Sequence, residues 1–297
     1  MTRMHVNEVD TDVGLVRRLL SAQFPEWAGL PIAPVASAGT DNALYRLGAD
    51  YVVRLPRIDW ATGQIEKERV WLPRLAPRLP LALPEQVAVG LPAEGYPWQW
   101  SVYRWLPGHS ATLATLADPV ETARDLARFV SALQGLDPSG GPDAAAHGLR
   151  GVSLKRRDAN TRRCIDALAG ELDAAAALRV WEAALAAPEW DRPPVWFHGD
   201  LLPGNVLVDQ GRVSAVIDYS GLGVGDPAPD LMIAWALFTG ASRAAFRDAL
   251  QIDDATWARG RGHALSQAVI FIPYYSDTNP IGVANARRQL AEVLAGA

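Results

Sequence analysis

HGDLLPGNVLVDQGRVSAVID, residues 198–218, carries more structural information than any other part of the chain. Two runs with the composition of β-strands, 206–208 and 213–218, flank the turn residues Gln210 and Gly211. Strand-like runs joined by a short Gly-containing turn predict a β-hairpin. A hairpin brings the residues just before its first strand close to those at the end of its second strand.

Three polar residues meet at that end of the predicted hairpin. With the turn at Gln210 and Gly211, Val208 pairs with Val213 and Asn205 lies near Val216. Asp218 then lies beside the loop that holds Asp200 and Asn205. Asp200 belongs to the loop that holds Asn205. Carboxylate and amide oxygens are the ligands that Mg²⁺ takes when few protein groups and several phosphate oxygens hold it. The hairpin therefore predicts a magnesium–phosphate site.

The spacing His-x-Asp-x-x-x-x-Asn, followed by an aspartate after a strand, is that of kinase catalytic loops. A structural interpretation competes with it, because the glycines, the proline and Asn205 all suit turns. The joint spacing of Asp200, Asn205 and Asp218 favours catalysis. We expect His198 to pack inside the loop and hold the Asp218 segment rather than to transfer protons.

The front of the chain supplies a possible phosphate clamp. Short strands are expected at 43–48 and 51–56, followed by a helix over 61–75. Arg54 lies near the end of the second strand, where a kinase-type site needs a fixed cation. Glu68 falls on the apolar stripe of the helix and requires a positive partner. The pattern predicts an Arg54–Glu68 ion pair, with Arg57 as the competing arginine.

The periodicity changes near Pro107. Strand patterns dominate before it, ending with the aromatic run 98–106, whereas helical patterns dominate after it. We expect an α+β fold with two lobes: a β-rich N-terminal nucleotide-binding lobe, residues 1–106, and a mainly helical C-terminal lobe, residues 107–297, carrying the catalytic loop and substrate site. Asp118-Pro119 predicts the start of a helix, and PYYSDTNP at 273–280 predicts an interruption near the C-terminus.

Composition excludes several classes of protein. The formal net charge of −5 and the lack of a basic cluster argue against nucleic-acid binding. One cysteine, Cys164, forms no internal disulfide and offers no metal-site spacing. No apolar run reaches the ~18 residues of a membrane span, and no leader-like segment follows Met1, so we expect a cytoplasmic protein without membrane contact.

The chain resembles the aminoglycoside phosphotransferase family, small-molecule kinases with a protein-kinase-like fold. HGDLLPGN and IDYSGLGVGDP carry the resemblance most specifically, and GTDNALYRLG, VVRLPR and IEKERVWL extend it to the front of the chain. The resemblance implies that Asp200 is the catalytic base and that Asn205 and Asp218 hold Mg²⁺. It further implies that the backbone near Arg104 and Leu106 binds the adenine of ATP or GTP.

Two positions depart from the kinase pattern. The nucleotide-clamping residue, often lysine, is Arg54, which keeps the charge and forks onto two phosphate oxygens. The front loop GTDNA lacks a full G-x-G-x-x-G motif. Thr40, Asp41 and Asn42 are therefore expected to cover the phosphates with their side chains and backbone.

The sequence does not decide which small molecule with a hydroxyl group is the phosphoryl acceptor. The resemblance favours aminoglycosides first and macrolides second, and a sugar or amino-alcohol metabolite suits the site equally. The C-terminal helices offer both acidic and aromatic residues: Asp253, Asp254, Asp277, Trp235, Trp257, Phe271, Tyr274 and Tyr275. A nucleotide-binding pseudokinase is a minor alternative. A protein kinase is disfavoured because only about ten residues follow Asp218 before the next helix. We expect a monomer or homodimer.

Two further aspartates, Asp226 and Asp230, follow the second strand in GDPAPDL. Asp226 precedes a proline and suits a turn. Asp230 falls in the first turn of the next helix, where the helix dipole favours an acid. We expect structural roles for both.

Overall fold

The computed structural model describes residues 4–5, 7–36 and 39–295. The chain divides into two compact units. The N-terminal unit comprises Met1–Pro77 and Leu83–Pro107, and the C-terminal unit comprises Arg78–Ala82 and Gly108–Ala297. Each unit has its own buried apolar core.

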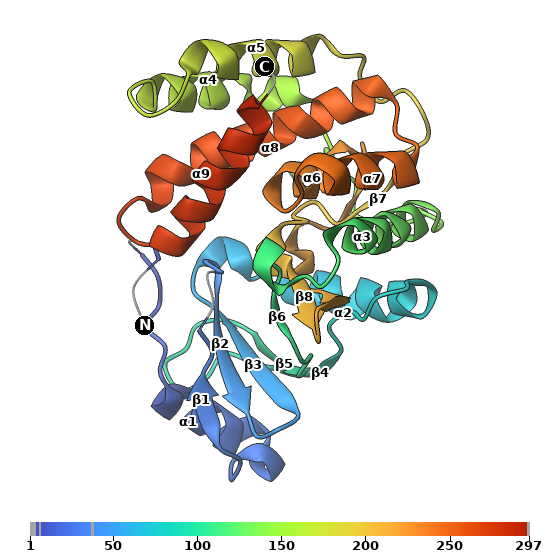
Figure 1. Cartoon of the computed structure of the whole chain (residues 1–297). Helices are drawn as coiled ribbons and strands as arrows, with labels where there is room; N and C mark the ends of the chain where they lie inside the picture. The colour runs from blue at the N-terminus through green and yellow to red at the C-terminus, as the bar shows by residue number, and fades with distance from the viewer. Residues whose placement is uncertain (1–3, 6, 37–38, 296–297) are drawn as a thin grey trace. The chain divides into compact units, whose positions relative to one another are not determined.

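A five-stranded antiparallel sheet forms the N-terminal unit (Figure 1). Its strands follow the order β1-β2-β3-β5-β4. Their bounds are β1 Ile32–Pro34, β2 Asn42–Leu47, β3 Tyr51–Pro56, β4 Gln86–Gly90 and β5 Trp100–Arg104. The predicted pair 43–48 and 51–56 is the β2–β3 hairpin, and alternate residues of β2 are buried, as a half-covered sheet requires.

Helices complete the core of this unit. They are α1 Val13–Gln23, α2 Gln64–Leu75 and the 3₁₀ turns Pro25–Trp27, Asp59–Ala61 and Ala76–Arg78. Leu19 and Leu20 of α1 pack in one apolar cluster with Tyr45 and Trp100 of the sheet. In α2 the buried residues include the whole predicted stripe: Ile65, Glu68, Leu72 and Leu75. The helix begins at Gln64 rather than at 61, because the preceding residues form a 3₁₀ turn.

The C-terminal unit is mainly helical. Its α-helices are α3 Pro119–Gln134, α4 Asp158–Ala167, α5 Ala174–Ala186, α6 Ile233–Ala236, α7 Gly240–Leu250, α8 Asp254–Tyr275 and α9 Pro280–Leu294. The Asp118 carboxylate accepts hydrogen bonds from the Val120 and Glu121 N–H groups at 2.9 and 3.0 Å, which confirms the predicted helix start. The predicted interruption at 273–280 is too long: α8 continues through Pro273 to Tyr275, and the break is confined to 276–279.

Two small sheets position the loops of this unit. One has the order β6-β8-β9, from β6 His109–Ser110, β8 Val206–Asp209 and β9 Arg212–Val216. The other pairs β7 Val195–Phe197 with β10 Gly223–Gly225. The sequence did not predict β6, β7 or β10, which have only two or three residues each.

The predicted hairpin is β8–β9. Gln210 and Gly211 have φ values of 49° and 80°, the left-handed conformation of a tight hairpin turn. Val208 pairs with Val213 as expected, and a bulge beside Leu207 shifts the rest of the register by one residue. The Ile217 N–H consequently donates to the Asn205 carbonyl at 2.9 Å, so Asn205 lies opposite the residue that precedes Asp218.

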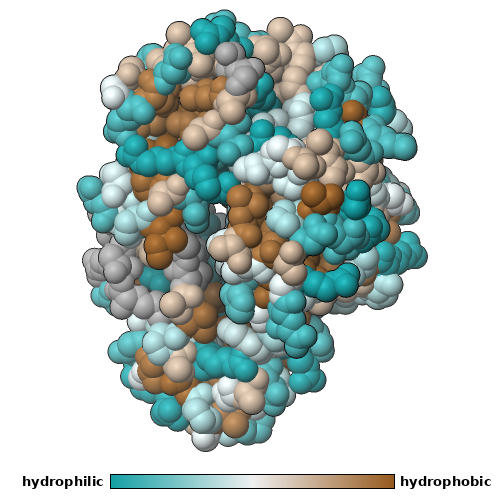
Figure 2. All heavy atoms as spheres, viewed as in Figure 1, coloured by the Kyte–Doolittle hydropathy of each residue, from teal (hydrophilic) through white to brown (hydrophobic). Residues whose placement is uncertain are grey.

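The predicted fold class is confirmed: the N-terminal part is a sheet with helices, and the C-terminal part is mostly helical. Within the described residues, no helix is both long and apolar enough to cross a membrane. On the face drawn in Figure 2, hydrophilic and hydrophobic residues are interspersed.

Candidate functional site

Four polar contacts hold Asp200, which lies in the loop after β7. Asn205 donates its amide nitrogen to the Asp200 carbonyl at 2.9 Å and to Oδ2 at 3.2 Å. Arg150 donates Nη1 to Oδ1 at 2.6 Å and to the Gly199 carbonyl at 2.8 Å. The Asp200 N–H donates to Nδ1 of His198 at 3.2 Å. The carboxylate, 23% exposed, is thus held in one orientation with a face open to an incoming hydroxyl.

Gly199 lets this loop approach the segment that follows Asp218. Its φ is +81°, and a Cβ there would lie 2.4 Å from the Gly221 carbonyl oxygen. A Cβ on Gly221 would in turn lie 2.9 Å from the His198 carbonyl. The two backbones touch, so no larger residue fits between them. This close approach explains the glycine of HGD.

His198 ties the two segments together. Its buried ring accepts the Asp200 N–H at Nδ1, and its Nε2 lies 3.1 Å from the Ile217 carbonyl. The pair of contacts assigns the proton to Nε2, which donates to Ile217. The ring packs against Tyr219 with a centroid distance of 4.6 Å. His198 therefore packs in the loop and holds the Asp218 segment, as its position predicts.

Asp230 organises the same loop, a role that the sequence did not reveal. The residue is fully buried in a 3₁₀ turn, Ala228–Met232, and its carboxylate accepts the N–H groups of His198 at 2.8 Å and Gly199 at 2.7 Å. Burial raises the pKa of Asp230, while His198 and the two N–H groups act in the opposite direction. The helix dipole alone does not explain Asp230, because its carboxylate accepts hydrogen bonds from a loop thirty residues earlier in the chain.

We expect Asp230→Asn to destabilise the fold by about 3 kcal/mol. Asparagine keeps the shape but offers one acceptor oxygen, so an N–H of the loop faces an NH₂ group in a buried position. Urea unfolding measures the change in the free energy of unfolding. The exposed Asp248→Asn in α7 is the control and should change it by less than 0.5 kcal/mol, about the usual limit for a surface substitution. Equal stabilities of the two variants would contradict the role of Asp230.

Asn205 and Asp218 supply the oxygens that the sequence predicts as metal ligands. The Asn205 amide nitrogen is occupied by Asp200, which leaves the amide oxygen as its ligand atom. Asp218 has φ 61° and ψ 76°, a left-handed conformation that a non-glycine residue adopts at some energetic cost. Among the described residues no three His, Cys, Asp or Glu side chains form a metal cluster. Two hard oxygen donors fit Mg²⁺, which needs few protein ligands when phosphates complete its shell.

Arg150 is the site residue that sequence reasoning missed. It lies in the irregular segment between α3 and α4, 50 residues before Asp200, where no local pattern marks it. Both of its hydrogen bonds use Nη1. Its guanidinium group therefore ties the Asp200 carboxylate to the backbone of the preceding residue.

The N-terminal unit contains the predicted ion pair. Arg54 Nη1 donates to both oxygens of Glu68, at 2.8 and 2.9 Å, and the Glu68 side chain is fully buried. Gln64 accepts from Arg54 Nη2, and the Tyr103 hydroxyl donates to Glu68. Burial, helped by the charge of Glu68, raises the pKa of Tyr103, which keeps this donor protonated. Arg57 is not a competitor, because it pairs with Glu8 at 3.2 Å.

The predicted phosphate-covering residues share one stretch of the same unit. Thr40 donates its hydroxyl to Asp41 at 2.9 Å, and Asp41 accepts the Arg57 N–H on its carbonyl at 2.8 Å. Asn42 begins β2 and lies 3.4 Å from Gln64, the partner of Arg54. The loop is therefore joined to the ion pair through Gln64.

The predicted adenine-binding backbone lies at and beyond the end of β5. The Arg104 N–H donates to the Glu85 carbonyl at 2.9 Å and is committed to the sheet. Leu106 follows the strand, and its backbone N–H makes no hydrogen bond within the described chain. Of the two predicted residues, Leu106 is the one with an N–H left for a base.

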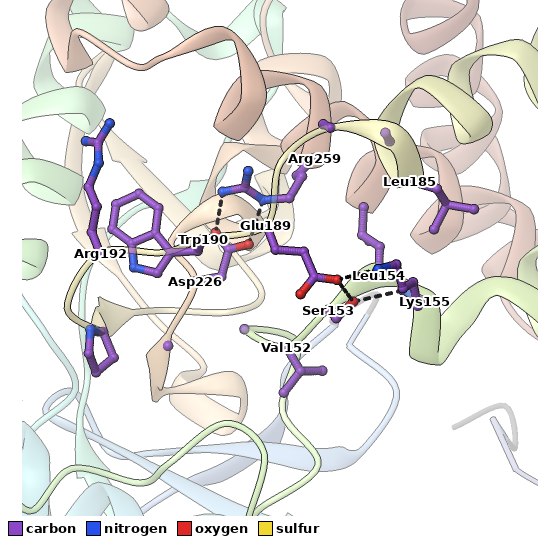
Figure 3. Close-up of a pocket in the computed structure, with 15 residues that line it drawn as sticks. Val152, Ser153, Leu154, Lys155, Leu185, Glu189, Trp190, Arg192, Asp226 and Arg259 are labelled. Atoms are coloured by element: carbon purple, nitrogen blue, oxygen red, sulfur yellow. Dashed lines mark hydrogen bonds and ion pairs between the residues drawn. The ribbon is translucent and has the colours of Figure 1, made fainter.

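A cavity of about 260 Å³ lies elsewhere in the C-terminal unit (Figure 3). It is bounded by Gly151–Lys155, the segment after α5, Gly225, Asp226 and Arg259. Gly225 pairs with Val195, so this cavity lies at the end of the β7–β10 pair opposite the Asp200 loop. None of the residues that we predicted as catalytic, nucleotide-binding or metal ligands lines it.

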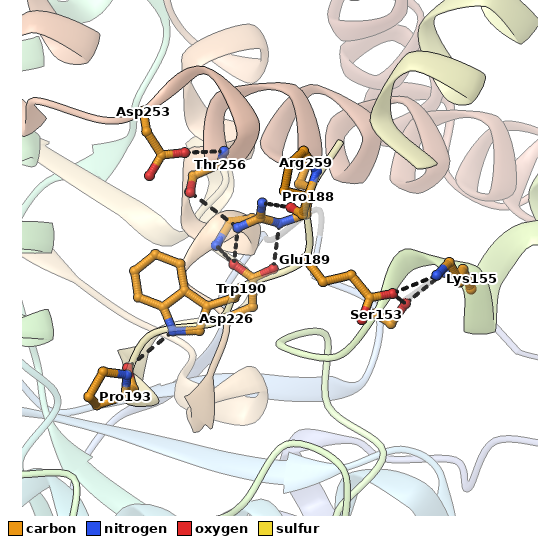
Figure 4. A network of polar contacts seen from close by, with 11 residues as sticks. Ser153, Lys155, Pro188, Glu189, Trp190, Pro193, Asp226, Asp253, Thr256 and Arg259 are labelled. Carbon is orange, nitrogen blue, oxygen red and sulfur yellow. Dashed lines mark hydrogen bonds and ion pairs between the residues drawn. The ribbon is translucent and has the colours of Figure 1, made fainter. Parts of the chain in front are cut away.

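Asp226 and Arg259 form the polar network of that cavity (Figure 4). Arg259 donates Nε to Asp226 Oδ2 at 2.8 Å and Nη2 to Oδ1 at 3.2 Å, and it also contacts Thr256 and the Pro188 carbonyl. Asp226 further accepts the Ala228 N–H at 2.9 Å. The expected structural role of Asp226 is confirmed.

A known family matches this chain in sequence, and known proteins resemble it in structure. Residues 33–263 match the phosphotransferase enzyme family. No protein with a curated description matches the sequence. Solved structures are similar over most or nearly all of the chain, at 17–24% identity, which establishes a shared fold.

Three of these structures illustrate the range. The GDP complex of aminoglycoside 2′-phosphotransferase-IIIa has a TM-score of 0.74 and 18% identity, covering 96% of this chain and 99% of that chain. Macrolide 2′-phosphotransferase type I has a TM-score of 0.63 and 22% identity, covering 96% and 99%. The streptomycin–ATP ternary complex of APH(2″)-IIa has a TM-score of 0.59 and 17% identity, covering 88% and 90%.

Proposed function

Because this chain belongs to the phosphotransferase enzyme family, we propose that it transfers the γ-phosphoryl group of ATP or GTP to a hydroxyl group of a small molecule. The observation that carries the proposal is the loop at Asp200. Its carboxylate is held by Asn205 and Arg150, and Asn205 is joined through the hairpin to the residue before Asp218. A base and two hard oxygen ligands thus occupy one short loop and one hairpin end.

Each residue then has a defined task. Asp200 accepts or orients the proton of the acceptor hydroxyl while the hydroxyl oxygen attacks the γ-phosphorus. The bond between the γ-phosphorus and the β–γ bridging oxygen breaks, and the nucleoside diphosphate leaves. Asn205 keeps the carboxylate in place through its amide nitrogen. Asn205 and Asp218 would hold Mg²⁺ by their side-chain oxygens, and the ion would supply charge neutralisation to the phosphates when bound. Transfer is mainly a matter of alignment and electrostatics, so fixed side chains suffice.

The nucleotide would be bound by the N-terminal unit. Arg54, held by Glu68, presents a cation for the phosphates, and Leu106 offers an N–H for the base. Thr40, Asp41 and Asn42 would cover the phosphates, and the Arg104 backbone flanks the base. Both ATP and GDP occur in complexes of proteins with this fold, so ATP and GTP are both proposed donors.

The acceptor is proposed at the level of a hydroxyl-bearing small molecule. Proteins named for aminoglycosides and for macrolides share the fold. The acidic residues that favour an aminoglycoside are not all available, since Asp253 pairs with Arg192 at 3.1 Å and Asp254 pairs with Arg247. Trp235 and Trp257 pack on each other with a centroid distance of 4.6 Å, and both line a second cavity of about 380 Å³.

A coupled ADP- or GDP-release assay tests the proposal. The protein is mixed with Mg²⁺, ATP or GTP, and a panel of aminoglycosides, macrolides, sugars, sugar acids and amino alcohols. We expect acceptor-dependent nucleoside diphosphate release and a phosphorylated product by mass spectrometry. Tight nucleotide binding without turnover for any acceptor would favour the pseudokinase alternative. Absence of nucleotide binding would contradict the proposal.

We expect Arg54→Lys to raise the KM for the nucleotide about tenfold. Lysine keeps the charge but cannot fork onto phosphate and carboxylate oxygens, and a charge-assisted hydrogen bond contributes about 1.5–3 kcal/mol. Steady-state kinetics at saturating acceptor measures the change. Arg57→Lys is a matched control, because Arg57 directly follows β3, is about equally buried and pairs with Glu8. Equal nucleotide KM values for both variants would contradict the clamp.

A further inference from the structure

Two arginines flank the loop 151–156 beside the proposed base, and they differ in how their charges are balanced. Arg150 contacts Asp200 with one nitrogen, Nη1. Arg157, at the end of the 3₁₀ turn Leu154–Arg157, has no acidic partner among the described residues. Arg150 is thus paired with Asp200, whereas the positive charge of Arg157 is left without an acidic partner.

Arg157 is held in place by neutral groups only. Its Nε donates to the Ser266 hydroxyl of α8 at 2.9 Å, and that hydroxyl is 2.8 Å from Thr161 of α4. Burial, with an added contribution from the charge of Arg150, lowers the pKa of Arg157 to about 10. The group stays charged at neutral pH, and its Nη1 and Nη2 atoms make no hydrogen bond within the described chain.

His263 lies one turn before Ser266 and adds no negative charge. The residue is 2% exposed, and neither ring nitrogen has a hydrogen-bond partner in the described structure. Burial lowers the pKa of His263 well below its usual range, and the charges of Arg157, Arg150 and Arg259 act in the same direction. The position next to the arginines, where an acid would balance them, is occupied by a neutral ring.

The contrast with Arg259 on the same face of α8 is informative. Arg259 is buried and fully satisfied, because Asp226 accepts two of its hydrogen bonds and Thr256 and Pro188 accept others (Figure 4). Burying a charge without a partner is costly, so buried arginines normally have an acid as Arg259 does. Arg157, which is partly buried, and the buried His263 have no such acid among the described residues.

We propose, on the basis of the proposed function, that the acceptor carries an anionic group, a carboxylate or a phosphate, which Arg157 and the remaining edge of Arg150 bind while its hydroxyl meets Asp200. A guanidinium group binds either anion through two parallel hydrogen bonds. His263, one helical turn from the Ser266 that holds Arg157, is neutral and adds no opposing charge. The same charges repel a polycation, so this site disfavours an aminoglycoside.

A binding titration tests the inference without knowledge of the acceptor. The thermal midpoint is measured against inorganic phosphate and against malonate, at ionic strength held constant with NaCl and with saturating Mg²⁺ and ADP. A ligand of the native state raises the midpoint. We expect Arg157→Gln to need at least about tenfold more anion for the same shift, because it loses a charge-assisted contact. Arg156→Gln, on the exposed neighbour, is the control and should respond like the parent protein.

The outcomes separate the inference from the function on which it rests. Equal anion responses of the parent and Arg157→Gln would overturn the anion site. A failure of ADP to stabilise even the parent would instead count against the proposed function. A stronger response to phosphate than to malonate indicates a phosphorylated acceptor, and the reverse indicates a carboxylate.

Turnover supplies a second arm with acceptors of one skeleton. Glucuronate, glucose and glucosamine differ in charge on a common ring, and nucleoside diphosphate release is measured for each. We expect nucleoside diphosphate release to be fastest with glucuronate. In Arg157→Gln, the ratio of the rate with glucuronate to the rate with glucose should fall about tenfold. Preferential use of glucosamine, unchanged by Arg157→Gln, would overturn the inference while leaving the phosphotransferase activity established. If none of the three reacts, the anion titration decides.

Discussion

Asp200→Asn is expected to lower kcat by about 10²–10⁴-fold, the usual effect of removing a positioned base. Asparagine has the shape of aspartate, and its one amide oxygen can still accept from Arg150, but it cannot take a proton from the acceptor. The KM for the nucleotide should change little, because the proposed nucleotide ligands belong to the N-terminal unit. The measurement is a full kinetic characterisation with the best acceptor of the panel.

Asp209→Asn at the far end of the hairpin is the matched control for this variant. Asp209 ends β8 and opposes Arg212 across the turn, away from Asn205. Its replacement should leave kcat within about twofold of the parent, since it lies outside the proposed site. A folded Asp200→Asn protein that turns over within a few-fold of the parent would show that another group accepts the proton.

Local patterns predicted the parts of the site that lie close together in the sequence. The turn at Gln210 and Gly211 defined the hairpin, and the apolar stripe of α2 identified Glu68 as an inward-facing acid. Its partner Arg54 followed, because a buried acid needs a cation and only two arginines lie near the end of that strand. These inferences needed only strand pairing, helix periodicity and charge balance.

The rest depends on contacts that no local pattern marks. Arg150 reaches Asp200 from an irregular segment, and Asp230 reaches back to the N–H groups of His198 and Gly199. The packing of α3 and β7 and the small β7–β10 sheet bring these partners together. The strands of that sheet are too short to be recognised from composition. The break before α9 was predicted too early, because a proline such as Pro273 removes a single hydrogen bond in the last turn.

The roles of the site residues rest on electrostatics as much as on position. The Asp200 carboxylate, held between an amide and an arginine, is fixed in orientation, which a base requires. A left-handed aspartate after β9 stores conformational strain, and such strain concentrates at sites where geometry matters. The catalytic and the structural interpretation of Asp218 therefore predict the most different effects of a substitution.

Asp218→Asn is expected to lower kcat at least ~10²-fold without changing stability. In the structural interpretation Asp218 only caps the 3₁₀ turn Tyr219–Gly221, where its carboxylate accepts the Ser220 N–H at 3.3 Å. Asparagine caps helices as well as aspartate and tolerates the left-handed conformation, so a structural role predicts a silent variant. A metal ligand predicts the opposite, because asparagine brings no negative charge to a cation that has only two protein ligands.

The magnitude follows from alignment. Displacement of the reacting atoms by ~1 Å costs ~10²-fold in rate, and loss of one of two protein ligands shifts Mg²⁺ and the phosphates together. Arg54 and the strand end near Leu106 still bind the nucleotide, so its affinity should fall less than kcat. The experiment measures thermal stability, nucleotide affinity with and without Mg²⁺, and turnover over a range of Mg²⁺ concentrations. A parent-like stability with a raised Mg²⁺ requirement supports the ligand role, whereas a stable variant with normal Mg²⁺-dependent turnover would place the metal elsewhere.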